Sequence, residues 1–150
     1  MKIGITSDHR GYKLKEKVTK YLKRKGYDVI DYGTNSSDIV DYSDYGIKLG
    51  EEYANNSFDL GIAICGNGIG ISIACNKVKG VRCAKVDNAN DAKQARKHND
   101  ANIIAIGSKK FLFEVKDIID AFINTPFSKI ERYSRRIEKI KDYEDKRAWT

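Results

Sequence analysis

The strongest chemical pattern in the chain lies between Asp59 and Lys77. Its apolar start, 59–64, predicts a strand buried on both faces, and Cys65 stands at its carboxyl end. Three alternating glycines follow it: Gly66, Gly68 and Gly70. Without side chains they let a ligand approach the backbone closely. A helix predicted over 71–77 would point the free N–H groups of its first turn back at Cys65. The pattern can therefore cradle an anion and make a thiolate available near neutral pH.

Taken by itself, this stretch is equally consistent with a reactive Cys65 and with an inert one. A Gly-x-Gly-x-Gly pattern is weak, and most buried cysteines are merely small hydrophobic side chains. Cys75 and Cys83 lie in apolar patterns of a predicted helix and strand, so we expect both to be structural. Three unevenly spaced cysteines form neither a disulfide framework nor a zinc pattern, and two histidines are too few for a histidine-rich metal site, so we expect no metal.

The chain of 150 residues suits one domain, residues 1–150, with a C-terminal helical extension from about 127. Its N-terminus enters a strand directly, without a signal-peptide pattern, and no apolar run is long enough to cross a membrane. We therefore expect a cytoplasmic protein without membrane contact.

The formal net charge is +7, and basic residues concentrate between Arg10 and Lys25, where eight stand against the single acid Glu16. Such a stretch can mark nucleic-acid binding. No aromatic or arginine-rich recognition motif accompanies it, so a solvated helix face is the favoured interpretation and no nucleic-acid partner is expected.

Strand and helix patterns alternate along the chain. Strands are predicted over 2–6, 27–32, 59–64, 81–86 and 102–107, with helices between them and one ending near Phe122. This alternation predicts an α/β fold, a Rossmann-like parallel sheet with helices on both faces. Ligands of such folds bind beyond the carboxyl ends of the strands, which here carry Asp8, His9, Cys65, Asp87 and 107–109. A last amphipathic helix with Arg132, Arg135 and Arg136 lies either over this edge or over a second subunit.

Four pieces, in this order and spacing, resemble the type B ribose-5-phosphate isomerases and the related galactose-6-phosphate and allose-6-phosphate isomerases. They are Asp8-His9-Arg10-Gly11, the 65–77 stretch, His98-Asn99-Asp100, and Arg132 with Arg136. The resemblance covers the chain from Met1 to about Tyr143. It implies a three-layer α/β/α sandwich with a five-stranded parallel sheet. It also implies a homodimer, or a dimer of dimers, whose sites form between two subunits.

The resemblance also implies roles for individual residues. Cys65 is similar to the base that removes the C2 proton of an open-chain aldose phosphate, without a cofactor. Backbone N–H groups of Gly66, Gly68, Ile69 and Gly70 would stabilise the enediolate. His98 would assist ring opening, while Asp8, Tyr42 and Asn99 would contact the sugar. The phosphate would be held by His9, Lys109, Arg132 and Arg136.

The chain departs from the pattern of the family at several positions. Asn67 replaces a hydroxyl residue that would move a proton between the two substrate oxygens. The resemblance implies ribose 5-phosphate as the substrate and ribulose 5-phosphate as the product, and this replacement leaves galactose 6-phosphate, allose 6-phosphate or a tetrose phosphate as the alternative. Tyr133 replaces a histidine, and Lys109 replaces an arginine. From another class, a phosphate- or nucleotide-binding module without catalysis would use the same glycines but would not need Cys65 or His98.

Overall fold

Five parallel strands form one sheet in the computed structural model, which describes residues 1–147. The strands are β1 (Lys2–Ser7), β2 (Asp28–Asp31), β3 (Leu60–Cys65), β4 (Cys83–Lys85) and β5 (Ile103–Gly107). Their order across the sheet is β2-β1-β3-β5-β4, and every neighbouring pair is parallel. The predicted five-stranded parallel sheet is confirmed.

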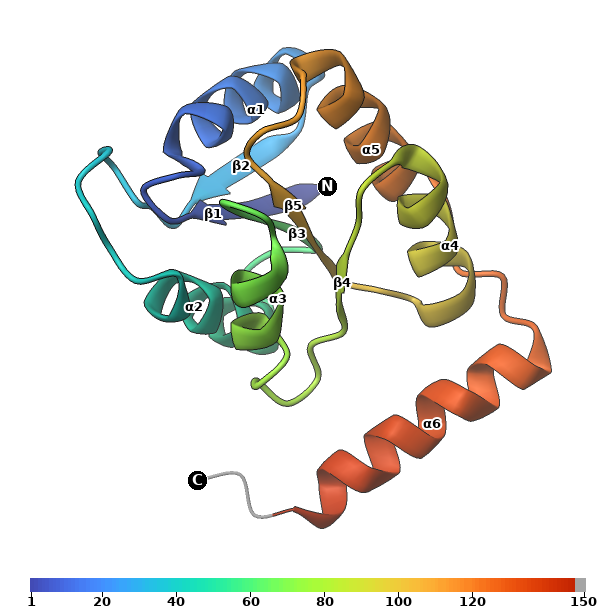
Figure 1. Cartoon of the computed structure of the whole chain (residues 1–150). Coiled ribbons are helices and arrows are strands. Elements are labelled where there is room, and N and C mark those ends of the chain that lie inside the picture. Colours follow the sequence, from blue (N-terminus) through green and yellow to red (C-terminus); the bar gives the residue numbers. More distant parts are fainter. Residues whose placement is uncertain (148–150) are drawn as a thin grey trace.

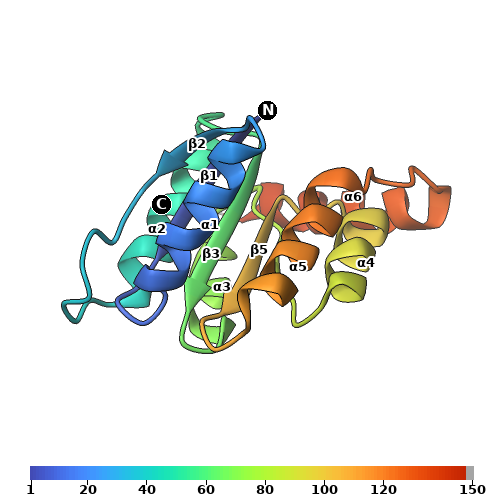
Figure 2. The same cartoon turned by 90° about the horizontal axis from the view of Figure 1, so that it is seen from above.

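Helices cover both faces of the sheet and give it three layers (Figures 1 and 2). On one face lie α1 (Tyr12–Arg24), α4 (Ala89–Asn99) and α5 (Leu112–Asn124), and on the other lie α2 (Tyr42–Ala54) and α3 (Ile69–Cys75). Figure 2 shows α1 and α5 side by side on the near face, with α2 and α3 behind the sheet. The α/β/α architecture is therefore as the sequence predicts.

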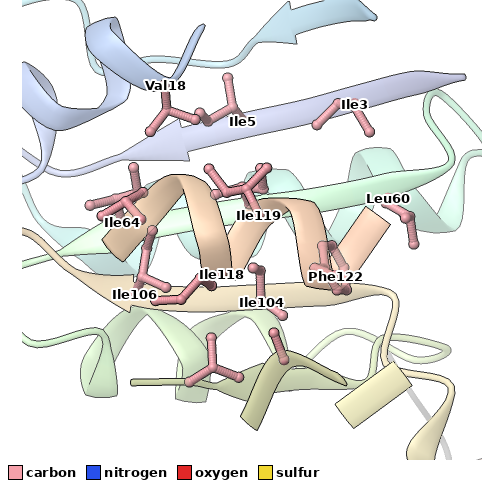
Figure 3. Packing of buried hydrophobic residues seen from close by; sticks show 14 of the residues in the cluster. Ile3, Ile5, Val18, Leu60, Ile64, Ile104, Ile106, Ile118, Ile119 and Phe122 are labelled. Carbon is pink, nitrogen blue, oxygen red and sulfur yellow. The ribbon is translucent and has the colours of Figure 1, made fainter. Parts of the chain in front are cut away.

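The larger half of the core lies under α1, α4 and α5. Alternate residues of β1, β3 and β5 point into it, and α5 crosses above them (Figure 3). Because β3 is central, all six of its residues are buried, which explains its continuous apolar run. This packing fixes the position at which β3 ends, and with it the position of Cys65, its last residue.

The smaller half of the core places α2 directly against α3. A Cβ at Gly46 would lie 2.7 Å from the Cβ of Ala74, and one at Gly50 would lie 2.7 Å from a methyl carbon of Val78. The two glycines therefore permit an approach that larger residues would prevent. Because α3 directly follows the glycine loop, the packing of α2 against α3 also fixes the position of that loop.

Several element boundaries differ from the sequence prediction by one or two residues, and two of the differences have a local reason. Helix α3 begins at Ile69, two residues early, because the Asn67 side chain accepts its N–H. The ladder of β4 begins only at Cys83, because the N–H of Arg82 donates to the Asn102 side chain instead. Helix α4 continues to Asn99.

The last helix, α6 (Glu131–Lys146), lies outside the three layers (Figure 1). Its Ile137 is buried, and Glu144 accepts a hydrogen bond from the N–H of Gly80. Near its end, Lys79 and Asp145 form an ion pair. These contacts place α6 beside the turn that leads into β4, so it does not cover the carboxyl ends of the strands. Within residues 1–147, no helix is long and apolar enough to span a membrane.

Candidate active site

A cavity of about 470 Å³ opens where the strands end. It is lined by Asp8, Arg10, Tyr42, Cys65, Gly66, Asn67, Ile69, Gly70 and Lys109. These residues come from the ends of β1, β3 and β5 and from the starts of α2 and α3. The convergence predicted from the parallel topology is therefore observed for Asp8, Cys65 and Lys109, whereas Asp87 is not among the lining residues.

Cys65 is the most buried nucleophile of this cavity. It is the last residue of β3, and its side chain is 4% exposed. The N–H of Gly68 donates a hydrogen bond to its Sγ over 3.2 Å. Gly68 has a φ of +80°, a left-handed conformation that a larger residue adopts only with strain. The loop thus turns an amide donor onto the sulfur.

The loop leaves fewer free amide donors than the sequence predicts. The N–H of Ile69 donates to Oδ1 of Asn67 over 2.9 Å, and that of Gly68 is taken by the sulfur. The first regular bond of α3 runs from the N–H of Ser72 to the carbonyl of Gly68, so the N–H of Gly70 has no partner in the helix. Within residues 1–147, Nδ2 of Asn67 also remains without a partner. An anion above Cys65 would find these two donors.

Asp8 and Arg10 also line the cavity. Asp8 is 5% exposed, and its carboxylate accepts the N–H of Gly11 through Oδ1, so it holds the turn before α1. Arg10 runs along the loop, with its Cδ 3.1 Å from where a Cβ of Gly66 would lie. The sequence reasoning gave Arg10 no role, although its position after β1 and its guanidinium suit an anionic ligand.

Tyr42 and Lys109 lie at the entrance. Tyr42 is the first residue of α2, and its ring rests on Gly70. Lys109 follows β5 and is exposed. His9, in contrast, does not line the cavity. Its Nδ1 lies 3.2 Å from the N–H and 3.1 Å from the carbonyl of Val40, which ties it to the loop 33–41.

Four predicted site residues lie elsewhere in the chain. His98 and Asn99 end α4, and Arg132 and Arg136 belong to α6. The ring of His98 stacks on Tyr133, and Arg82 binds the carbonyl of Asn99. This second group lies where β5 begins, whereas Cys65 lies where β3 ends.

The register of the sheet gives the distance between this second group and Cys65. Cys65 pairs with Gly107, and Gly61 pairs with Ile103 at the start of β5. Four residues of parallel strand span roughly 13 Å. One chain therefore does not bring His98 to the cavity of its own Cys65.

The remaining thiols are structural in their surroundings. Cys75 is fully buried, and Cys83 is partly exposed. Hydrogen bonding to Cys75, and then burial, raise the pKa of the Cys83 thiol, so it stays protonated near neutral pH. Within residues 1–147, no three His, Cys, Asp or Glu side chains gather to hold a metal ion.

Known proteins are similar to this chain along almost its whole length. The family model described as ribose/galactose isomerase matches residues 3–140. The ribose-5-phosphate isomerase B of Mycobacterium tuberculosis is 38% identical over 146 residues, which cover 96% of this chain and 90% of that protein. The Clostridium thermocellum ribose-5-phosphate isomerase B structure has a TM-score of 0.94 and 46% identity, covering 97% of this chain and 99% of the other. The Mycoplasma genitalium enzyme, solved with bound ribulose 5-phosphate, has a TM-score of 0.92 and 39% identity, covering 97% of each chain.

Proposed function

This chain belongs to the ribose/galactose isomerase family and is an aldose–ketose isomerase of sugar phosphates; from that premise we propose that it interconverts ribose 5-phosphate and ribulose 5-phosphate. The observation that carries this proposal is the buried Sγ of Cys65, which faces a cavity and accepts the N–H of Gly68. A sugar bound in that cavity would meet the sulfur at its reacting carbons.

In the proposed reaction, the thiolate of Cys65 is the general base. It removes the proton from C2 of the open-chain aldose, and the electron pair moves into a C1–C2 double bond. The carbonyl oxygen on C1 becomes negative as this enediolate forms. Return of the proton to C1, with transfer of the hydroxyl proton from O2 to O1, gives the ketose. No electrons enter or leave, so the reaction needs no redox cofactor.

The negative oxygens of the enediolate need donors that are already in place. The free N–H of Gly70 and Nδ2 of Asn67 lie on the same loop as Cys65 and supply them. Asp8 faces the cavity as the acceptor for a sugar hydroxyl. Arg10 and Lys109 provide positive charge for the phosphate.

We further propose that the site is completed by a second copy of the chain. His98 and Asn99, with Arg132 and Arg136, would reach the cavity of the partner, where the imidazole assists ring opening and the arginines bind phosphate. Two observations support a homodimer. Arg135 is paired with Glu131, whereas Arg132 and Arg136 have no carboxylate partner within residues 1–147. Beside the cavity, Ile69 and Ile73 of α3 are 50% and 55% exposed, an apolar surface that a partner would cover.

Asn67 supports a second candidate substrate, another aldose phosphate with a tetrose or hexose chain. Its amide donors face the cavity where a hydroxyl would carry protons, so they would hold an extra or differently placed sugar hydroxyl. The free thiols Cys65, Cys75 and Cys83 fit a reducing cytoplasm, where we expect the protein to act.

Proton exchange in deuterated water tests the proposal. Ribose 5-phosphate, galactose 6-phosphate, allose 6-phosphate and erythrose 4-phosphate are each incubated with the protein and followed by NMR. We expect ketose to form fastest from ribose 5-phosphate, with solvent deuterium at the carbon next to the carbonyl. Cys65→Ala should abolish this incorporation, and the matched variant Cys75→Ala should retain it. Faster turnover of another sugar would replace the substrate, and normal turnover by Cys65→Ala would remove the mechanism.

A further inference from the structure

The side chain of Tyr133 joins two residues of the second half-site, the group formed by His98, Asn99, Arg132 and Arg136. Its ring stacks on the imidazole of His98, with 4.4 Å between the centroids and 28° between the planes. Its hydroxyl accepts a hydrogen bond from Nη2 of Arg132 over 3.0 Å, and the guanidinium carbon lies 4.7 Å from the ring centroid. His98 ends α4 and Arg132 begins α6, so Tyr133 connects two separate helices.

We propose that Tyr133 is a positioning residue of the isomerase reaction, which fixes the His98 imidazole and the Arg132 guanidinium as one unit. The inference rests on the proposed roles of His98 in ring opening and of Arg132 in phosphate binding. It adds that the two groups are held in register by a third side chain that touches neither the sugar nor the phosphate.

The backbone around Tyr133 is already fixed. Both the N–H and the hydroxyl of Ser128 donate to the carbonyl of Lys97, which ties the segment before α6 to the end of α4. The N–H groups of Tyr133 and Ser134 then donate to the carbonyl of Ile130 and form the first turn of α6. Tyr133 therefore stands on a rigid base beside α4.

The side chains of His98 and Arg132 lack such support. Within residues 1–147, the imidazole of His98 makes no hydrogen bond, and its described side-chain partner is the ring of Tyr133. Arg132 is exposed, and its long side chain would otherwise sample many rotamers. Ordering both groups before the substrate arrives lowers the entropy cost of reaching the reactive arrangement.

The ring and the hydroxyl of Tyr133 act on different partners, so two variants separate them. Tyr133→Phe keeps the stack on His98 and removes the acceptor for Arg132. We expect KM to rise about threefold to tenfold with kcat nearly unchanged, because a hydrogen bond to a charged group is lost. Tyr133→Leu removes the stack as well. We expect kcat on a furanose-forming sugar phosphate to fall about tenfold or more in addition.

Tyr143 provides a matched control on the same helix. Its hydroxyl accepts from Nη1 of Arg147 over 2.7 Å, so it forms the same kind of pair but has no histidine beside it. Tyr143→Phe and Tyr143→Leu should leave both kcat and KM at wild-type values. Equal effects at Tyr133 and Tyr143 would show a general contribution to α6 and overturn the proposal.

NMR gives a readout that does not depend on turnover. The chain has only two histidines, His9 and His98, so the imidazole Hε1 signal of His98 is assigned by its loss in His98→Asn. The ring current of Tyr133 shifts this signal. Tyr133→Leu should move it and leave that of His9 in place, whereas Tyr133→Phe should preserve it. An unmoved signal in Tyr133→Leu would overturn the stack in solution.

The same set of variants separates this inference from the proposed function. If His98→Asn and Arg132→Gln are impaired but Tyr133→Leu turns over normally, only the positioning role is lost. If His98→Asn and Arg132→Gln are themselves fully active, the assignment of the second half-site fails first.

Discussion

The ring of Tyr42 rests on the backbone of Gly70: a Cβ added to Gly70 would lie 2.7 Å from two of its ring atoms. Tyr42 begins α2, and Gly70 lies in the first turn of α3. Both residues line the cavity. The missing side chain at Gly70 therefore sets how close the ring comes to the first turn of α3.

This contact predicts opposite effects of Gly70→Ala on stability and on activity. Alanine favours helix over glycine by about 1 kcal/mol, and the exposed ring of Tyr42 can swing away, so stability should hold or rise slightly. Turnover should fall about tenfold because the displaced ring no longer borders the substrate. Urea denaturation and steady-state kinetics measure the two effects.

A double-mutant cycle identifies the cause. If Gly70→Ala acts by moving the ring, it should have little further effect on turnover in a Tyr42→Leu background. Full additivity of the two losses would mean that Gly70 acts through its own backbone, independently of Tyr42.

Mixed dimers should report whether the site is shared between chains. Cys65→Ala and His98→Asn should each be inactive as homodimers. After the two variants are unfolded, mixed in equal amounts and refolded, we expect about a quarter of wild-type turnover, since half of the dimers are mixed and each has one intact site. Light scattering and a mass tag on one variant verify that mixed dimers form. Formation without recovery of activity would place both residues in one chain's site.

Much of the cavity around Cys65 could be predicted from the sequence, because the patterns that indicate it are local. The apolar run before Cys65 indicates a buried strand, and the glycines after it indicate a tight turn. Parallel topology then brings Asp8 and Lys109 to the same edge without any knowledge of side chains.

The rest of the site depends on long-range contacts that no local pattern encodes. His9 follows β1 as closely as Asp8 does, yet a hydrogen bond with Val40, 31 residues away, holds it outside the cavity lining. The position of α6 follows from contacts with Gly80 and Lys79. Lys15 lies in a stretch predicted to be a solvated basic face, but it is fully buried and pairs with Asp31.

That burial makes Lys15 a test of stability. Its Nζ lies 2.6 Å from Oδ2 of Asp31, while Oδ1 of Asp31 accepts the N–H of Gly33. Lys15→Ala leaves a cavity and should cost about 2–4 kcal/mol in the free energy of unfolding. Lys15→Met fills the same space, so it should cost about 1–2 kcal/mol less than Lys15→Ala. Asp31 loses its cation in both variants, but its side chain is 31% exposed and keeps the N–H of Gly33.

The exposed Lys17 on the same helix is the control for Lys15. Lys17→Ala should change stability by no more than about 0.5 kcal/mol in urea denaturation. Equal losses in Lys15→Ala and Lys15→Met would instead assign the stability to the charge of Lys15.

The hydrogen bond from the N–H of Ile69 to Oδ1 of Asn67 predicts how position 67 acts. With its oxygen occupied, the amide of Asn67 can donate to a sugar but cannot accept and pass on a proton. Asn67→Thr replaces the two amide N–H donors with one hydroxyl on a shorter side chain, so KM for the preferred sugar phosphate should rise about threefold to tenfold, with kcat on ribose 5-phosphate little changed. Kinetics of both proteins across the sugar-phosphate panel measure this.

If position 67 must instead carry a proton between O1 and O2, threonine would raise kcat on ribose 5-phosphate by about 10²- to 10⁴-fold, with little change in KM. Identical kinetics of the two proteins on every sugar would contradict both accounts and leave the loop amides as the donors that select the substrate.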